Sequence, residues 1–455
     1  MSDEETRLHP EQDSELLEAV QDALAEDSSA RLEEALREVP PADVAAVLGD
    51  LEEEQQAELF RRLDADLRPE VLGELGDEAL RTLAEMAPRR LEDAVSRMEP
   101  DEVADVLDVL PDAQTEAFLE RFPDEQAATA EQLLSYPADS AGGLMTTEFI
   151  LLPADLSAAK AIETIRRERE AETVSVLFVS EKDDRLAGYV PLDRIVFAPE
   201  EQEVGELVEE CPLVVGPEAD QEDLVRGATR YDLSVIPVTD AEDRMIGVVT
   251  VDDILEAAEQ EADEDMYRLA GTGERDPVHA SVVRSTRLRL PWLLLSVMDG
   301  LFIAFVVSRF VDTMRMVELS FFLPLIPLMG GQVAIQGSTI VVRALAVGSI
   351  RRGRALRFLG KQFVITVLLA VSCAVVAGVL GGLVVAAGTA LMMAVGLAVG
   401  VSILFAGMLG MVFPFVFNRI GIDPAVSSGP FITMLNDLFC ISIYLALGTM
   451  LAPPA

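Results

Sequence analysis

The sequence is poor in the residues on which thiol, redox and histidine chemistry depend. Its 455 residues include only three cysteines and two histidines. Cys211, Cys373 and Cys440 are far apart, so they predict neither a disulfide framework nor a thiolate metal site. His9 and His279 have no partner in the sequence at metal-ligand spacing. The sequence also lacks a P-loop, a catalytic triad and a phosphorylation aspartate motif, and we therefore do not expect an enzyme.

Lysine is scarce too, and the distribution of charge divides the chain in two. Only three lysines occur beside 32 arginines, and the net charge of the whole chain is −44. Residues 1–280 carry a net charge of −51, whereas residues 281–455 carry +7. The acidic surface would repel phosphates, which argues against a nucleic-acid partner. Such a surface suits a protein adapted to concentrated salt, but clustered carboxylates also bind hard cations such as Mg²⁺.

Residues 1–135 carry a pattern of short helices with a loose internal repeat. Each unit opens near proline or aspartate, which favours a helix start, and continues with apolar residues at helical spacing. The units lie at 39–51, 62–75, 86–98 and 98–110. No unit of this length can bury its own apolar face, so the pattern predicts an all-α superhelical N domain formed by stacking. From the sequence alone, we interpret this acidic domain as a scaffold.

Residues 136–258 change to valine-rich runs that alternate with helical stretches. A strand–turn–strand–helix unit occurs at 184–195 and again at 243–254, which predicts a pair of α/β modules. The two units resemble tandem CBS domains. That resemblance implies a nucleotide ligand, with ATP or another adenine nucleotide as the candidate.

The second module carries the residues of a nucleotide site. Gly247, Thr250 and Asp253 follow a G-h-h-T-x-x-D pattern, in which the hydroxyl and the carboxylate of CBS domains contact the ribose and phosphates. The first module has Pro191 and Arg194 at the hydroxyl and carboxylate positions, which does not favour a nucleotide there. The alternative for the second module is a tight β–α turn with a helix N-cap.

Residues 252–271 predict an amphipathic helix that leads towards the membrane, and we assign 259–280 to a connecting segment. The carboxylates opposite its apolar stripe are Asp253, Glu256, Glu261 and Glu264, with Asp265 beside the stripe. Like charges on one helix repel each other at close range. Bound divalent cations would relieve that repulsion. The alternative is the solvated face of a salt-adapted helix.

Residues 281–455 contain five apolar stretches long enough to cross a lipid bilayer. They lie at about 290–309, 319–347, 359–386, 388–417 and 427–451. The pattern predicts an all-α transmembrane domain of five helices. The whole chain is therefore expected to be multidomain, with an all-α N domain, α/β CBS domains and a helical membrane domain.

Basic residues predict the orientation of these stretches. They cluster before the first stretch, at 351–361 between the second and third, and at Arg419 between the fourth and fifth. With five spans these positions share one side, and basic loops favour the cytoplasm. The polar, acidic N-terminus does not resemble a signal peptide. We therefore expect a multi-pass protein of the plasma membrane whose N-terminus is cytoplasmic.

Asp437 is a carboxylate inside the fifth apolar stretch. A charge that faces lipid is costly, so this side chain should face a protein-lined or water-filled space. Thr433 and Gly429 precede it by one and two helical turns. Because Mg²⁺ gives up water reluctantly, proteins commonly hold it through one or two carboxylates and keep several waters. Asp437 is therefore a candidate ion site on a cation path.

Prolines and glycines interrupt the second apolar stretch around Gly330, Gly331 and Gln332. Carbonyl groups freed at bilayer depth are tolerated where they line a cavity. These three residues are therefore candidates for the wall of the same path. The alternative is a kinked helix whose small residues pack against a neighbour.

Taken in this order, the parts resemble the MgtE family of magnesium channels over nearly the whole chain. The most specific matches lie at 136–149, 249–253, 289–294, 341–348 and 423–437. The resemblance implies a homodimer that requires no other protein, with one pore on its two-fold axis lined by the second and fifth spans. It implies that Asp437 holds hydrated Mg²⁺ and that Gly429 and Thr433 line the pore.

The resemblance also implies regulation by cytosolic Mg²⁺. In the family, the connecting helix acts as a plug, and ions that bridge carboxylates of the cytosolic elements hold the gate shut. The residues that would bridge are Asp253, Glu256, Glu261, Glu264 and Asp265, with Asp101 and Asp105 from the N domain.

One segment departs from the family pattern. Family members usually show GGN-x-G-x-Q in the second span, whereas this chain has Gln332 in place of the asparagine and Ala334 in place of the third glycine. The longer amide and the added methyl group would change the pore wall. Two alternatives therefore stand beside a Mg²⁺ channel: a channel for another divalent cation such as Co²⁺ or Mn²⁺, and a non-conducting membrane sensor of Mg²⁺ or nucleotide.

Overall fold

The structure is a computed structural model that divides into two compact units, with the boundary between Ala257 and Ala258. It describes residues 10–37, 39–98, 100–119, 121–167, 175–181, 185–270, 282–310, 320–346, 355–385, 389–420, 422, 424 and 430–451.

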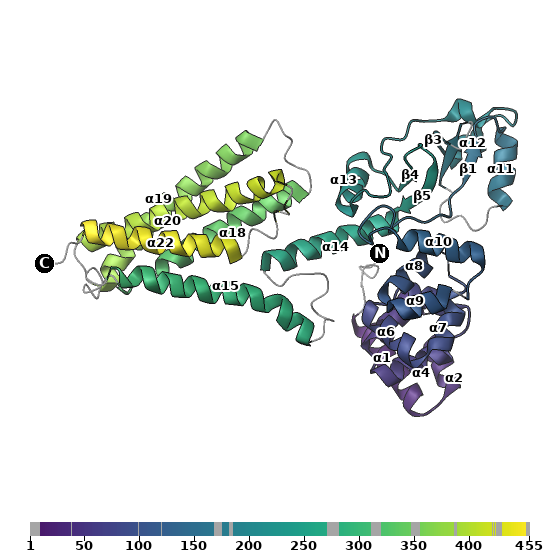
Figure 1. Cartoon of the computed structure of the whole chain (residues 1–455), viewed down its shortest axis with the longest axis horizontal. Helices are drawn as coiled ribbons and strands as arrows, with labels where there is room; N and C mark the ends of the chain where they lie inside the picture. The colour runs from purple at the N-terminus through teal and green to yellow at the C-terminus, as the bar shows by residue number, and fades with distance from the viewer. Residues whose placement is uncertain are drawn as a thin grey trace, which may run out of the picture. The chain divides into compact units, whose positions relative to one another are not determined.

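The first unit opens with a stack of short helices (Figure 1). They are α1 Pro10–Ala25, α2 Ser29–Ala35, α3 Pro41–Asp50, α4 Glu53–Arg62, α5 Leu67–Gly73, α6 Asp77–Met86, α7 Pro88–Val95, α8 Pro100–Val109, α9 Asp112–Leu119 and α10 Asp124–Leu134. Pro41 and Pro88 begin two of these helices, at a position where the missing N–H group costs nothing. One apolar core runs through the stack and includes Leu48, Phe60 and Leu91. The all-α prediction for this region is confirmed.

Two small sheets follow, each built from the predicted strand–turn–strand–helix unit. The first sheet has the order β1 Leu151–Pro153, β2 Val176–Ser180 and β3 Leu186–Pro191, and the second pairs β4 Val235–Thr239 with β5 Met245–Thr250. Strands β2 and β3 are antiparallel, as are β4 and β5, whereas β1 runs parallel to β2. The remaining elements are α11 Ala158–Arg167, α12 Leu192–Phe197, the 3-10 helix η1 Val204–Leu207 and α13 Gln221–Tyr231.

The N domain and the second module share an apolar core within this unit. Ala104 of α8 and Leu133 of α10 pack with Met145, Ile236 and Val249 of the module. Because these side chains are buried together, the loop at 140–146 and the end of β5 are held close to α8.

Helix α14 spans Val251–Ala270 and begins directly after β5. The predicted helix over 252–271 is thus confirmed up to Ala270. The remainder of the connecting segment, residues 271–280, lies outside the described residues.

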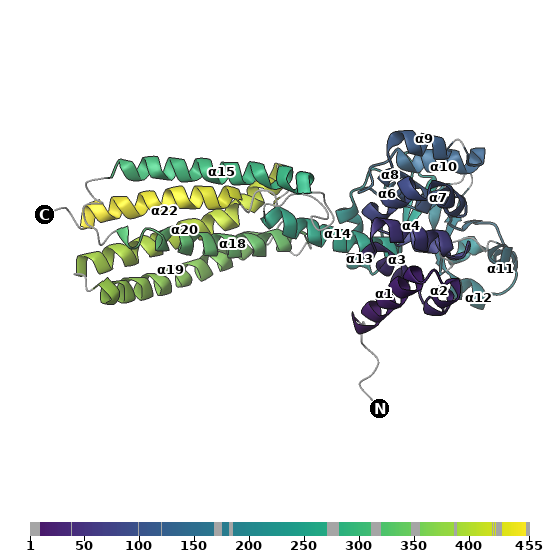
Figure 2. The ribbon, with the colours of Figure 1, turned by 90° about the horizontal axis from the view of Figure 1, so that it is seen from below.

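The second unit contains the long apolar helices α15 Val282–Ser308, α18 Leu325–Ala346, α19 Ala355–Val385, α20 Thr389–Arg419 and α22 Pro430–Leu451. Within the described residues, five helices are long and apolar enough to cross a membrane, as the sequence predicted. Helix α20 packs against α18, α19 and α22, and α15 packs against α22 (Figure 2).

The predicted interruption of the second stretch is wrong over 325–346, where α18 is one continuous helix. Pro327 lies in its first turn, where an N–H group would have no partner inside the helix, so the proline does not break it. Gly330 of this stretch serves close packing instead: a Cβ atom there would lie 2.4 Å from Asn436 Oδ1 of α22.

Candidate functional site

Asp437 lies on α22, half-buried, next to the fully buried Asn436. The Asn436 Nδ2 atom donates one hydrogen bond to Asp437 Oδ1, at 2.9 Å, and another to the carbonyl oxygen of Pro327 on α18, at 3.1 Å. Cys440 Sγ donates to Asn436 Oδ1 at 3.1 Å. The carboxylate is therefore tied through one amide to a neighbouring helix.

The pore-wall candidates on α18 have different surroundings. A Cβ atom on Gly330 would meet Asn436 Oδ1 at 2.4 Å and Cys440 Sγ at 2.9 Å, and one on Gly331 would lie 3.7 Å from Asn436 Nδ2. These two glycines thus face α22, and Gly330 permits its close approach. Gln332 is exposed in the single chain.

The two residues that depart from the family pattern, Gln332 and Ala334, lie in different environments. Ala334 is fully buried in a cluster with Ala406 and Ile432, so its added methyl group takes part in helix packing. Thr433 is half-buried one turn before Asp437, and Gly429 lies outside the described residues.

A second carboxylate in an apolar span, Asp299 on α15, is absent from the residues that the sequence predicted for the site. Most of the surface of α15 is exposed in the single chain, but Trp292, Leu295 and Asp299 are partly covered and recur at helical spacing. The charges of Asp299 and Asp437 are close enough to interact, and their helices pack together. A charged residue in an apolar span is itself the signal that would have found it.

Asp101 and Asp105 of α8 lie close to Asp253 and Glu256 of α14, all within the first unit. Burial raises the pKa of the Asp105 carboxyl to about 7, aided by the charges of Asp101, Asp253, Glu256 and Asp108. Although the Asp105 side chain is exposed at the surface, the protein packed around it and the neighbouring like charges disfavour its ionised form.

The other two aspartates of this group are perturbed in the same direction. Burial raises the pKa of Asp253 to about 6, with Asp252 and Asp101 adding to the effect, although a hydrogen bond from Thr250 opposes it. Burial also raises the pKa of Asp101, partly offset by hydrogen bonds that include one with Thr146. Asp101 Oδ1 is buried and has no hydrogen-bond partner.

The remaining sensor candidates lie further along α14. Glu261, Glu264 and Asp265 belong to the second unit, where Glu264 forms an ion pair with Arg268. Across the described residues, three or more carboxylate, thiol or imidazole groups do not converge tightly enough to hold a metal ion between them. The acidic residues of the first unit therefore interact through their charges rather than as a closed ligand cage.

The residues of the predicted nucleotide site have local roles. A Cβ atom on Gly247 would lie 2.7 Å from Met145 Sδ and 2.9 Å from the carbonyl oxygen of Thr146. Thr250 Oγ1 lies 2.9 Å from Asp253 Oδ2 and also within hydrogen-bond reach of Asp252, so its single proton is shared between two acceptors. This geometry is that of a close-packed β–α turn whose hydroxyl contacts the first turn of α14.

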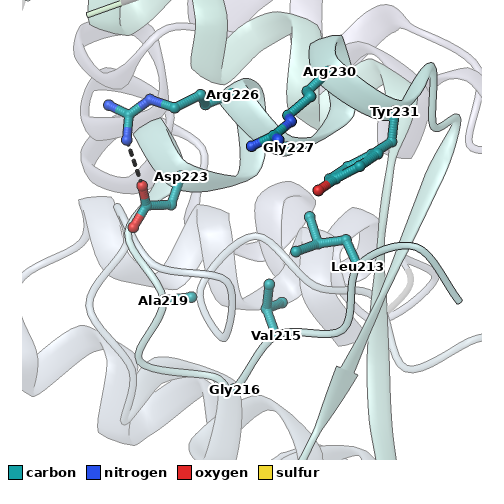
Figure 3. Close-up of a pocket in the computed structure, with 9 residues that line it drawn as sticks. All are labelled: Leu213, Val215, Gly216, Ala219, Asp223, Arg226, Gly227, Arg230 and Tyr231. Atoms are coloured by element: carbon teal, nitrogen blue, oxygen red, sulfur yellow. Dashed lines mark hydrogen bonds and ion pairs between the residues drawn. The ribbon is translucent and has the colours of Figure 1, made fainter. Parts of the chain in front are cut away.

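A separate cavity of about 360 Å³ lies in the second module (Figure 3). Its lining comprises Leu213, Val215, Gly216, Ala219, Asp223, Arg226, Gly227, Arg230 and Tyr231. Arg226 bonds to Asp223 at 2.8 Å, and the guanidinium of Arg230 lies 5.2 Å from the centre of the Tyr231 ring. The lining does not include Gly247, Thr250 or Asp253.

Comparisons with known proteins match this chain along most of its length. The family described as "Divalent cation transporter" matches residues 323–447, the "MgtE intracellular N domain" matches 39–139, and the "CBS domain" matches 141–201 and 204–260.

Two relatives cover nearly the whole chain. A protein of Thermus thermophilus named "Magnesium transporter MgtE" is 29% identical over 449 residues, which are 96% of this chain and 99% of the relative. A protein of the same name from Bacillus subtilis is 27% identical over 416 residues, 90% of this chain and 92% of the relative. Among solved structures, the cytosolic domain of the Mg²⁺ channel MgtE in complex with ATP matches with a TM-score of 0.50 and 29% identity, covering 53% of this chain and 99% of that one.

Proposed function

Because this chain belongs to the MgtE family of divalent cation transporters, we propose that it conducts Mg²⁺ across the plasma membrane along a path that passes Asp437. The family is one of transporters rather than enzymes, as the sequence led us to expect. The observation that carries the proposal is a half-buried carboxylate on an apolar helix, held in one orientation by a buried amide.

A carboxylate in this position suits a hydrated ion. Mg²⁺ keeps most of its water, so Asp437 would accept hydrogen bonds from bound water rather than replace the whole hydration shell. Asp299 would add a second negative charge nearby, which favours a divalent over a monovalent ion. In a homodimer, the partner subunit would bring a second copy of the same pair, with Gly429, Thr433 and Gln332 along the path.

We propose that cytosolic Mg²⁺ closes the channel by binding between α8 and α14. Asp101, Asp105, Asp253 and Glu256 place like charges close together, and Asp101 Oδ1 is buried without a hydrogen-bond partner. A divalent cation would reduce the repulsion between these carboxylates and would bind the buried Asp101 oxygen. Glu261, Glu264 and Asp265 would extend the same response along α14.

ATP, or another adenine nucleotide, is the ligand proposed for the CBS pair. The support is the likeness to a cytosolic domain solved with ATP and the pattern of Gly247, Thr250 and Asp253. A nucleotide would have to compete with the hydrogen bond between Thr250 and Asp253.

The test is Mg²⁺ flux into proteoliposomes that contain the full chain. Asp437→Ala should abolish flux, whereas Ser296→Ala, which removes an exposed polar side chain from α15, should not. Flux of Co²⁺ or Mn²⁺ in preference to Mg²⁺ would favour the channel for another cation. No flux in the unsubstituted protein, with Mg²⁺ still bound by the cytosolic domains, would favour the membrane sensor.

A further inference from the structure

Asn436 is a primary amide with no exposed surface, placed within an apolar span. A buried amide without hydrogen-bond partners would destabilise the folded protein strongly. Here each group is used: Nδ2 donates to Pro327 and to Asp437, and Oδ1 accepts from Cys440. Because Nδ2 faces two acceptors and Oδ1 faces a donor, the amide has one favourable orientation.

We propose that Asn436 is a positioning residue for the ion site: it holds the Asp437 carboxylate in a fixed position relative to the first turn of α18. The proposal rests on the proposed function of Asp437. The hydrogen bond to Pro327 fixes the Asn436 amide to α18, a helix far away in the sequence. The hydrogen bond to Asp437 then fixes the carboxylate to that amide. One oxygen, Oδ1, is thereby fixed, and Oδ2 is left to face a hydrated ion.

Gly330 on α18 leaves the space that the Asn436 amide occupies. Any Cβ atom there would come within 2.4 Å of Asn436 Oδ1, so a side chain would push the amide off both of its acceptors. The carbonyl of Pro327 can accept the additional bond because a carbonyl oxygen has two lone pairs. Gly330, Pro327 and Asn436 therefore act together, and the glycine pair of the second span is explained by the position of a side chain on the fifth.

If Asn436 positions the carboxylate, replacing it should change the affinity and selectivity for the ion, and not only the amount of active protein. A hydrated ion is recognised through water molecules whose geometry depends on a fixed carboxylate, and a loosened carboxylate binds it less well. We therefore expect Asn436→Ala to raise the half-saturating Mg²⁺ concentration at least about fivefold and to weaken discrimination against Ca²⁺. An amide that only held α18 to α22 would lower maximal flux while leaving half-saturation and Ca²⁺ competition unchanged.

The experiment measures Mg²⁺ flux into proteoliposomes of the full chain over a range of Mg²⁺ concentrations, with and without Ca²⁺. Cys440→Ala is the matched control, because it removes the bond to Oδ1 and leaves both bonds from Nδ2. The Cys440→Ala variant should keep the half-saturating Mg²⁺ concentration of the unsubstituted protein. If Asn436→Ala does not give folded protein, Gly330→Ala serves instead, since the added methyl group displaces the amide without removing it, and the same shift is expected.

The outcomes separate this inference from the function on which it rests. Asp437→Ala that conducts normally would overturn both. Loss of flux in Asp437→Ala, together with unchanged half-saturation and Ca²⁺ competition in Asn436→Ala or in Gly330→Ala, would overturn the positioning role alone. An equal shift in Cys440→Ala would also overturn it, because that variant keeps the link to Pro327 and Asp437.

Discussion

Asp105 of α8 lies close enough to Asp253 of α14 for the charge of Asp253 to disfavour the ionised form of Asp105. The two residues belong to different domains of the first unit, and the shared core around Ala104 and Met145 holds those domains together. The first unit thus contains an electrostatic repulsion at the contact where α14 begins. Its consequences for stability, and for the response to Mg²⁺, can be measured.

The stability of the first unit should fall as the pH rises. In the folded unit, the carboxyl pKa is about 7 for Asp105 and about 6 for Asp253, above the values of the unfolded chain. The folded unit therefore binds more protons than the unfolded chain between about pH 4 and pH 7. Its stability is lost as the pH rises through these two pKa values. Because Asp105 is exposed and solvent screens its charge, we expect a loss of only about 1 kcal/mol, or roughly 2–4 °C in Tm.

Thermal unfolding of a fragment ending at Ala270, in buffers without divalent cations, measures this effect. Asp105→Asn should flatten the dependence on pH, and added Mg²⁺ should restore stability at the higher pH. Glu54→Gln removes one exposed charge from α4 and is the control for overall charge. Equal slopes in the two variants would contradict the placement of the repulsion at Asp105.

Neutralising the carboxylates of α14 should remove closure by Mg²⁺. In a variant with Asp253, Glu256, Glu261 and Glu264 replaced by their amides, the cation has too few anionic oxygens to bridge, and the channel should stay open at high internal Mg²⁺. Flux from proteoliposomes loaded with graded internal Mg²⁺ measures this.

The matched control for that variant replaces four exposed carboxylates of the N domain, Glu33, Glu34, Glu53 and Glu54, by glutamine. It changes the net charge equally and should close as the unsubstituted protein does. Unchanged closure in the α14 variant would mean that its carboxylates only keep the surface hydrated.

Removing the charge of Asp299 should weaken, but not abolish, Mg²⁺ flux. Asp299→Asn keeps the size of the side chain and deletes one of two interacting charges, so we expect the half-saturating Mg²⁺ concentration to rise roughly three- to tenfold. Flux assays on this variant and on Ser296→Ala, a neighbouring position on the exposed side of α15, test the expectation. Identical behaviour of both would place Asp299 away from the ion.

Gly247→Ala should destabilise the second CBS module. The added methyl group would lie 2.7 Å from Met145 Sδ and 2.9 Å from a backbone oxygen, and overpacking of this kind costs about 1–3 kcal/mol. Gly216→Ala is the control in the same module, because a Cβ atom there meets nothing within 4 Å. Thermal unfolding compares the two, and equal stability would show that Gly247 is not needed for packing.

Calorimetric titration with ATP separates the packing role of Gly247 from a role in binding. If the Thr250 hydroxyl contacts a nucleotide, Thr250→Val should lose ATP binding and keep most of the stability of the module. If the hydroxyl only bonds to Asp252 and Asp253, ATP affinity should be unaffected while the start of α14 loosens.

Most helices and strands of this protein can be predicted from its sequence, because their signals are local. Five long apolar stretches fixed the membrane helices, since burying about twenty apolar residues in lipid needs only their hydropathy and length. The repeated strand–turn–strand–helix pattern and the proline-led helices likewise depend on neighbours along the chain. Asp437 stood out for the same reason: a charge is rare in such a segment.

Which of these residues meet depends on how the helices pack in three dimensions. The bond from Asn436 to Pro327, the closeness of Asp299 to Asp437 and the crowding of Asp105 by Asp253 each join segments far apart in the sequence. No local pattern encodes such pairs, because they follow from how helices pack: glycines such as Gly330 and Gly410 set how closely two backbones approach. Hydropathy selects which faces are buried, but the shapes of the side chains across each contact determine which polar groups are brought together there.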